Sequence, residues 1–237
     1  MRKTQLIVLG YAGSQASNFN NLSQYLDENI ILSVIEYKGR GTRREEVFYE
    51  NCIEMEKDIA EQIKKARIKE YPYAILGYSM GVQNVYELFA KKLLEECPIA
   101  IFVAAHEPPN VECAAKKISV NNDGTFQEYI KRYGGLDERL LCEPRFAEIY
   151  ITRIYADFKL LKMYSFNGEY RCFPIKLNVL YCEADTPLET IKDWRLFATN
   201  VDFHELGHNH FFYKTDTKKF CDIIKNSIRG GYNSEEY

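Results

Sequence analysis

The fold is decided by the stretch Tyr73-Ala74-Ile75-Leu76-Gly77-Tyr78-Ser79-Met80-Gly81, in which a short apolar run passes through a tight turn into a helical pattern. The run to Leu76 predicts a buried strand, and the pattern from Met80 to Leu94 predicts a helix. Glycines at positions 77 and 81 suit a strained turn and close packing of strand against helix. Because a serine on such a turn stands exposed above the sheet, we predict that Ser79 is a nucleophile. The alternative is a turn serine without chemistry.

The segments around this turn alternate between apolar strands and amphipathic helices. This alternation predicts an α/β chain with a mostly parallel central sheet and helices on both faces, as in the α/β-hydrolase fold. Strands are expected at residues 5–9, 30–37, 73–76, 99–104, 177–182 and 201–206, and helices at 18–26, 53–68, 80–94, 188–197 and 217–227.

Residues 111–171 interrupt the alternation with a helical pattern. Helices are expected there at 126–133, 145–150 and 154–164, in a segment far longer than an ordinary connection. We therefore expect a core of residues 1–110 and 172–237 and an inserted helical lid of residues 111–171. The polar tail from Gly230 onward is expected to fray.

A serine hydroxyl needs a nearby base, which a carboxylate holds in place, and in this fold the chain order is Ser, Asp, His. His208 and His210 both follow the last expected strand, where the base belongs, and their spacing leaves both open. Asp185 follows the strand at 177–182 and is the candidate carboxylate, with Glu183 as a close rival.

The histidines also admit a metal-binding interpretation. His204, His208 and His210 are clustered in sequence, but no carboxylate or cysteine lies among them at ligand spacing. We expect no metal site and no bound cofactor.

A second glycine-rich turn, Gly10-Tyr11-Ala12-Gly13-Ser14, follows the first expected strand. In this fold such a turn supplies one backbone N–H to an oxyanion hole, and the residue after the nucleophile supplies another. We predict these donors to be Ala12 and Met80; the alternative is an ordinary glycine-rich turn.

Composition limits the classes of partner. The formal net charge is −3 and basic residues are interspersed with acidic ones, so we expect no nucleic-acid partner. No apolar stretch is long enough to span a bilayer, and residues 6–9 fit a first strand better than a signal peptide. The seven cysteines are scattered and contain no Cys-x-x-Cys pair, as expected for a reducing compartment. We expect a cytoplasmic monomer.

With these pieces in place, the chain resembles the type II thioesterases, the stand-alone partners of nonribosomal peptide and polyketide synthases, which are similar to medium-chain fatty-acyl thioesterases. The resemblance covers nearly the whole length. Its first half is carried by Leu9-Gly10-Tyr11-Ala12-Gly13-Ser14, which is similar to the family's Phe-Pro-Tyr-Ala-Gly-Gly, by Lys38-Gly39-Arg40-Gly41-Thr42-Arg43, and by the turn at Ser79. Its second half is carried by Tyr133-Gly134-Gly135-Leu136, by Arg153-Ile154-Tyr155-Ala156-Asp157-Phe158, and by His210-Phe211-Phe212.

The resemblance implies a function and selects His210 as the base. Ser79, His210 and Asp185 would hydrolyse acyl or aminoacyl thioesters on phosphopantetheine carrier proteins, clearing stalled or wrong groups during antibiotic biosynthesis. Two alternatives remain: a small-molecule esterase or acyl-CoA hydrolase with the same triad, and a non-catalytic binding module on the hydrolase fold.

Several residues depart from the family pattern. Gly10 and Lys38 stand where proline is usual, Tyr78 replaces a histidine, and His208 stands where a small residue is usual. Tyr78 and His208 are therefore expected to crowd or polarise the site. The arginines at positions 40, 43 and 44 would guide an acidic carrier domain; the alternative is that Arg40 braces the local turn while Arg43 and Arg44 are solvated.

Overall fold

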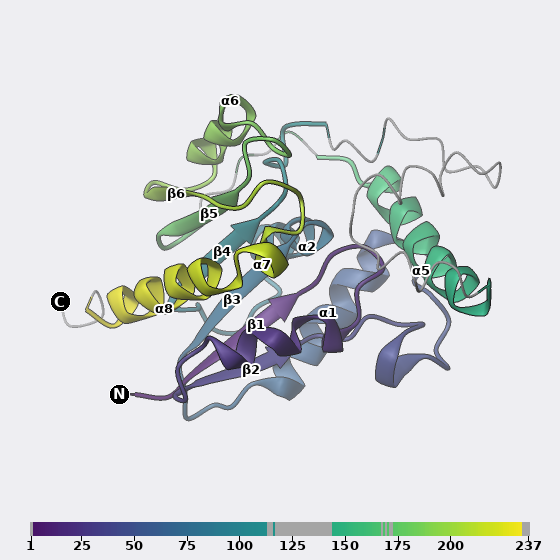
Figure 1. Cartoon of the computed structure of the whole chain (residues 1–237), viewed down its shortest axis with the longest axis horizontal. Coiled ribbons are helices and arrows are strands. Elements are labelled where there is room, and N and C mark those ends of the chain that lie inside the picture. The colour runs from purple at the N-terminus through teal and green to yellow at the C-terminus, as the bar shows by residue number, and fades with distance from the viewer. Residues whose placement is uncertain are drawn as a thin grey trace.

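The strand and helix that flank Ser79 set the centre of the molecule. The computed structural model describes residues 2–112, 116, 144–166, 168, 170 and 173–233 (Figure 1). Strand β3, Tyr73–Tyr78, is buried along its whole length, and helix α2, Met80–Ala90, follows directly after Ser79. The helix ends before the predicted Leu94, since Lys92 adopts a φ of 54° outside the right-handed helical region.

The described strands form one parallel sheet in the order β2-β1-β3-β4-β5-β6. Because every strand runs in the same direction, all carboxyl ends meet at one edge. The predicted parallel α/β sheet is confirmed. The other strands are β1 Thr4–Leu9, β2 Ile30–Val34, β4 Ala100–Ala104, β5 Leu177–Tyr181 and β6 Val201–Glu205.

Apolar side chains cover both faces of the sheet. In β1, Ile7 and Leu9 belong to one buried cluster while Leu6 and Val8 belong to the other, as the twofold period of a strand requires. Helices α1, Cys52–Ala66, and α2 contribute to the first cluster, and η1, Ala16–Gln24, and α8, Thr217–Asn233, contribute to the second (Figure 1). The shorter helices are η2 Gly41–Arg43, α6 Leu188–Ile191, η4 Lys192–Leu196 and α7 Phe212–Thr215.

Helix α5, Pro144–Met163, lies at the right of Figure 1, away from the two chain ends. It joins two pieces that the sequence predicted separately, at 145–150 and 154–164. The Cys52 thiol at the start of α1 donates to the Leu160 carbonyl of α5 over 3.4 Å. The expected helix at 126–133 and the segment Tyr133-Gly134-Gly135-Leu136 lie outside the described residues, so the lid boundaries 111–171 stay a prediction.

The carboxyl-terminal helix corrects one expectation. Fraying was predicted from Gly230, but α8 continues to Asn233, and the rest of the tail, 234–237, lies outside the described residues. A side chain at position 231 would place its Cβ 2.6 Å from the Ile99 carbonyl oxygen, so glycine allows the last turn to pack against the start of β4.

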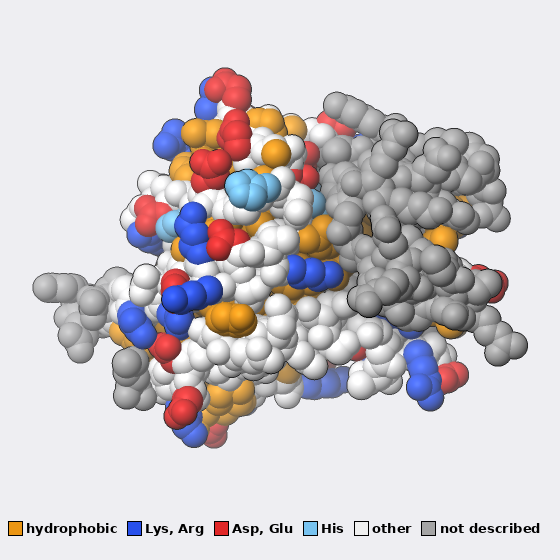
Figure 2. All heavy atoms as spheres, viewed as in Figure 1, with side chains coloured by type: hydrophobic (Ala, Val, Ile, Leu, Met, Phe, Trp, Pro, Cys, Tyr) orange, Lys and Arg blue, Asp and Glu red, His pale blue; other side chains and the backbone are white. Residues whose placement is uncertain are grey.

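The visible surface carries acidic and basic side chains side by side, without a large patch of one sign (Figure 2). This pattern agrees with the small net charge of −3. Among the helices of the described ranges, none is long and apolar enough to cross a membrane.

Candidate active site

Ser79 occupies a strained turn at the carboxyl end of β3. Its φ of 52° and ψ of −119° lie in a region that residues other than glycine rarely adopt. Its backbone N–H donates to the Ala104 carbonyl of β4 over 2.8 Å. Gly77 and Gly81, on either side of this turn, leave no room for a side chain. A Cβ added at Gly77 would lie 2.6 Å from the Gly81 carbonyl oxygen, and one added at Gly81 would lie 2.1 Å from the Leu9 carbonyl oxygen.

His210 and Asp185 lie beside Ser79, on the loops that follow β6 and β5. The Nε2 atom of His210 is 3.1 Å from Ser79 Oγ, and its Nδ1 atom is 2.8 Å from Asp185 Oδ2. The His210 and Asp185 side chains are only 11% and 10% exposed. With Nδ1–H donating to the carboxylate, Nε2 is left as the acceptor for the serine proton. The arrangement therefore suits proton transfer from a serine nucleophile.

The other residues considered for the base, the carboxylate or a metal site lie outside this arrangement. His208 is exposed, and His204 lies within β6. The Glu183 carboxylate accepts the Leu188 N–H over 2.9 Å at the start of α6. The part of the chain that the structure describes contains no group of three His, Cys, Asp or Glu residues able to hold a metal ion.

The predicted oxyanion donors lie on two segments in close contact. Gly81, beside Met80, packs directly on the Leu9 and Gly10 carbonyls that lead into the turn of Ala12. Met80 is the first residue of α2, so its N–H lacks an intrahelical acceptor. No described residue accepts a hydrogen bond from the Ala12 N–H. The two N–H groups are thus available, and their role as an oxyanion hole stays a prediction.

Tyr78 does not line the site as its place in the sequence suggested. Its side chain is fully buried in the cluster that contains Phe19, Phe212 and Tyr213. Its hydroxyl donates to the His210 carbonyl over 2.5 Å. Burial is the largest of the effects that raise the pKa of Tyr78 well above its usual value, so the hydroxyl stays protonated and remains a donor. Sequence reasoning missed this contact, since nothing in the sequence pairs positions 78 and 210.

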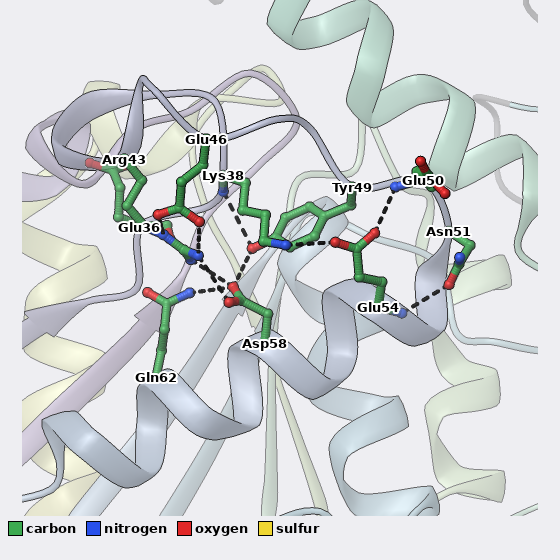
Figure 3. A network of polar contacts seen from close by, with 10 residues as sticks. All are labelled: Glu36, Lys38, Arg43, Glu46, Tyr49, Glu50, Asn51, Glu54, Asp58 and Gln62. Carbon is green, nitrogen blue, oxygen red and sulfur yellow. Dashed lines mark hydrogen bonds and ion pairs between the residues drawn. The ribbon is translucent and has the colours of Figure 1, made fainter.

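Two of the three arginines make structural contacts within the protein. Arg40 is fully buried, and its Nε donates to the Lys38 carbonyl over 3.3 Å. Figure 3 shows the Arg43 guanidinium enclosed by the carboxylates of Glu46 and Asp58. Carrier guidance by Arg40 is therefore wrong and its bracing role is confirmed. The expectation of a solvated Arg43 is also wrong, since its side chain is 18% exposed, whereas Arg44 is exposed beside Glu45 as expected.

A parallel α/β sheet with a serine on a strained turn, and a histidine and an aspartate at the ends of later strands, defines an α/β-hydrolase of the serine type. The family profile of the thioesterase domain matches residues 4–228, and the chain belongs to this family of hydrolases that act on thioesters.

Individual proteins agree with this assignment. The gramicidin S biosynthesis protein GrsT of Aneurinibacillus migulanus is 28% identical over 96% of this chain and 90% of its own length. The probable anguibactin biosynthesis thioesterase AngT of Vibrio anguillarum is 23% identical over 90% of this chain and 86% of its own. The crystal structure of ClbQ, from the colibactin nonribosomal peptide/polyketide synthase pathway, superposes with a TM-score of 0.84 at 23% identity, covering 98% of this chain and 99% of ClbQ. The resemblance to type II thioesterases is confirmed.

Proposed function

We propose that the chain is an editing thioesterase that removes acyl or aminoacyl groups from phosphopantetheine carrier proteins of a nonribosomal peptide or polyketide synthase in the cytoplasm. The observation that carries the proposal is the pair of contacts that links Ser79 to His210 and His210 to Asp185 in a member of the thioesterase family. The similarity to GrsT, a gramicidin S biosynthesis protein, and to AngT, a probable anguibactin biosynthesis thioesterase, supports the choice of carrier-bound substrates.

In the proposed reaction, Ser79 Oγ attacks the thioester carbonyl while His210 Nε2 takes its proton. Asp185 accepts the Nδ1–H bond and stabilises the imidazolium that forms. The N–H groups of Met80 and Ala12 bind the developing oxyanion, each contributing about 3–4 kcal/mol. The phosphopantetheine thiolate leaves readily, because a thiol pKa is about 8.5, and it takes the proton from the His210 imidazolium. Neutral His210 then deprotonates a water that attacks the acyl-serine, and it returns that proton to Ser79 Oγ as the acid leaves.

Residues 111–171 are proposed to form an inserted lid on a core of residues 1–110 and 172–237. The described helix α5 supports this division, because it lies between β4 and β5 in the chain and contacts the turn of Gly13. We further propose that the enzyme acts as a monomer without a bound cofactor.

The test compares hydrolysis of an acyl-loaded carrier protein, the matching acyl-CoA and a p-nitrophenyl ester, with released acid measured by intact mass and chromatography. Ser79→Ala and His210→Ala should abolish turnover. His208→Ala is the matched control, since this histidine lies two residues away and is exposed. Retained activity in Ser79→Ala would exclude the mechanism, and faster turnover of acyl-CoA than of carrier would favour an acyl-CoA hydrolase. Absence of both turnover and fluorophosphonate labelling would favour a non-catalytic binding module.

A further inference from the structure

The turn after β1 is held from three sides by buried side chains outside the Ser79–His210–Asp185 arrangement. The Tyr37 hydroxyl donates to the Gly10 carbonyl over 3.0 Å. The Gly13 N–H donates to the Asp157 carboxylate over 2.6 Å, and Arg40 Nη1 donates to the Ser14 carbonyl over 3.2 Å. These contacts bracket Ala12 on both sides.

Arg40 and Asp157 form a two-pronged ion pair in the interior. Their side chains are 0% and 1% exposed, and the two nitrogen–oxygen distances are 2.6 and 2.7 Å. Burial alone would lower the pKa of Arg40, but the charge of Asp157 and its hydrogen bonds outweigh burial and raise that pKa, so the guanidinium stays charged. Buried ion pairs are often no more stabilising than apolar side chains of similar volume. A contribution to stability therefore does not explain why Arg40 and Asp157 are held in this two-pronged geometry.

Helix α5 presses on the same turn. Ile154 lies one helical turn before Asp157, and a Cβ added at Gly13 would come within 2.3 Å of Ile154 Cγ1. Gly13 also has a φ of 81°, which favours glycine. The turn therefore meets α5 through a tight apolar contact and a charged hydrogen bond at the same residue.

We propose that Asp157 and Arg40 are positioning residues that fix the Ala12 N–H opposite the Met80 N–H and couple the placement of α5 to the oxyanion hole. This inference rests on the proposed function only in that both require Ser79 to act as the nucleophile. Side chains hold three backbone groups of the turn, namely the Gly10 carbonyl, the Gly13 N–H and the Ser14 carbonyl. The Ala12 N–H, in contrast, donates to no described acceptor. Loss of the Asp157 carboxylate would release the peptide next to the oxyanion donor.

The test uses p-nitrophenyl butyrate, so that it does not depend on the carrier protein. In Asp157→Asn, kcat should fall by about 10- to 100-fold, less than the roughly 100- to 1000-fold loss on removing an oxyanion donor, because the N–H is displaced and not deleted; KM should change by less than about threefold. The affinity for an alkyl boronic acid should fall by the same factor, because the tetrahedral adduct uses the same N–H groups.

Two further variants separate positioning from folding. Arg40→Met/Asp157→Leu removes both charges, so the melting temperature should return toward that of the wild type while kcat stays low, because Gly13 has lost its acceptor. Asp58→Asn breaks a comparable two-pronged pair with Arg43 away from the site, so it should lower the melting temperature and leave kcat unchanged (Figure 3).

Wild-type kcat and boronate affinity in a folded double variant would overturn the inference. An equal loss of kcat in Asp58→Asn would do the same. A wild-type enzyme that cleaves the ester and ignores carrier thioesters would refute the proposed substrate alone and leave the Asp157 comparison valid.

Discussion

Replacing Ser79 by glycine should make the protein more stable than replacing it by alanine, although both variants are inactive. The φ of 52° and ψ of −119° at this residue are strained for any side chain with a Cβ. Alanine keeps the Cβ and the strain, whereas glycine removes them. Both substitutions delete the same hydroxyl and its contact with His210, so that loss cancels in the comparison.

The expected difference follows from two opposing effects. Backbone strain of this kind costs about 1–3 kcal/mol, and we take about 2. Glycine gives back about 1 kcal/mol through the greater entropy of the unfolded chain. Ser79→Gly should therefore exceed Ser79→Ala by about 1 kcal/mol in the free energy of unfolding, or about 2–4 °C in melting temperature for a chain of this size.

Urea and thermal unfolding of the two purified variants measure this difference directly. The slope of the urea transition should be the same in both, because neither substitution changes the surface exposed on unfolding. A Ser79→Ala variant as stable as Ser79→Gly would refute the reasoning, since it would mean that the turn stores no strain that a Cβ feels.

Three other substitutions test the surroundings of the site. Tyr78→Phe removes the donor to the His210 carbonyl and should lower the free energy of unfolding by about 1–3 kcal/mol and reduce kcat, measured by urea unfolding and ester hydrolysis. Asp185→Asn should lower kcat by roughly 10⁴-fold with little change in melting temperature, as expected when the histidine loses its orienting carboxylate; a loss below tenfold would contradict that role. Burial lowers the pKa of His204, so the unfolded chain binds more protons and stability should fall as the pH drops below about 6.5; His204→Gln should flatten that fall in urea titrations, and an unchanged profile would disprove it.

The sequence was sufficient for the sheet because each strand is an apolar run followed by a turn, and such runs need no knowledge of distant contacts. The position of Ser79 was equally local, since two glycines and a helix start define the turn. The choice between His208 and His210 was not local: both lie on one loop, and only the family resemblance selected the one that contacts Ser79. The contacts of Asp157 with Arg40 and of Tyr78 with His210 were missed, because residues 117 and 132 positions apart meet only in the folded chain.

The departures from the family pattern at the first turn are coupled by space. A Cβ at Gly10 would lie 2.2 Å from Ser14 Oγ, so a proline there would force the serine hydroxyl to rotate away, whereas the family's segment combines proline with glycine at these two places. This chain instead has glycine at position 10 and serine at position 14. Tyr37 and Arg40 hold the backbone carbonyls of these two residues, contacts that do not depend on which side chain is present. The exchange can therefore leave the path of the turn, and with it the direction of the Ala12 N–H, unchanged.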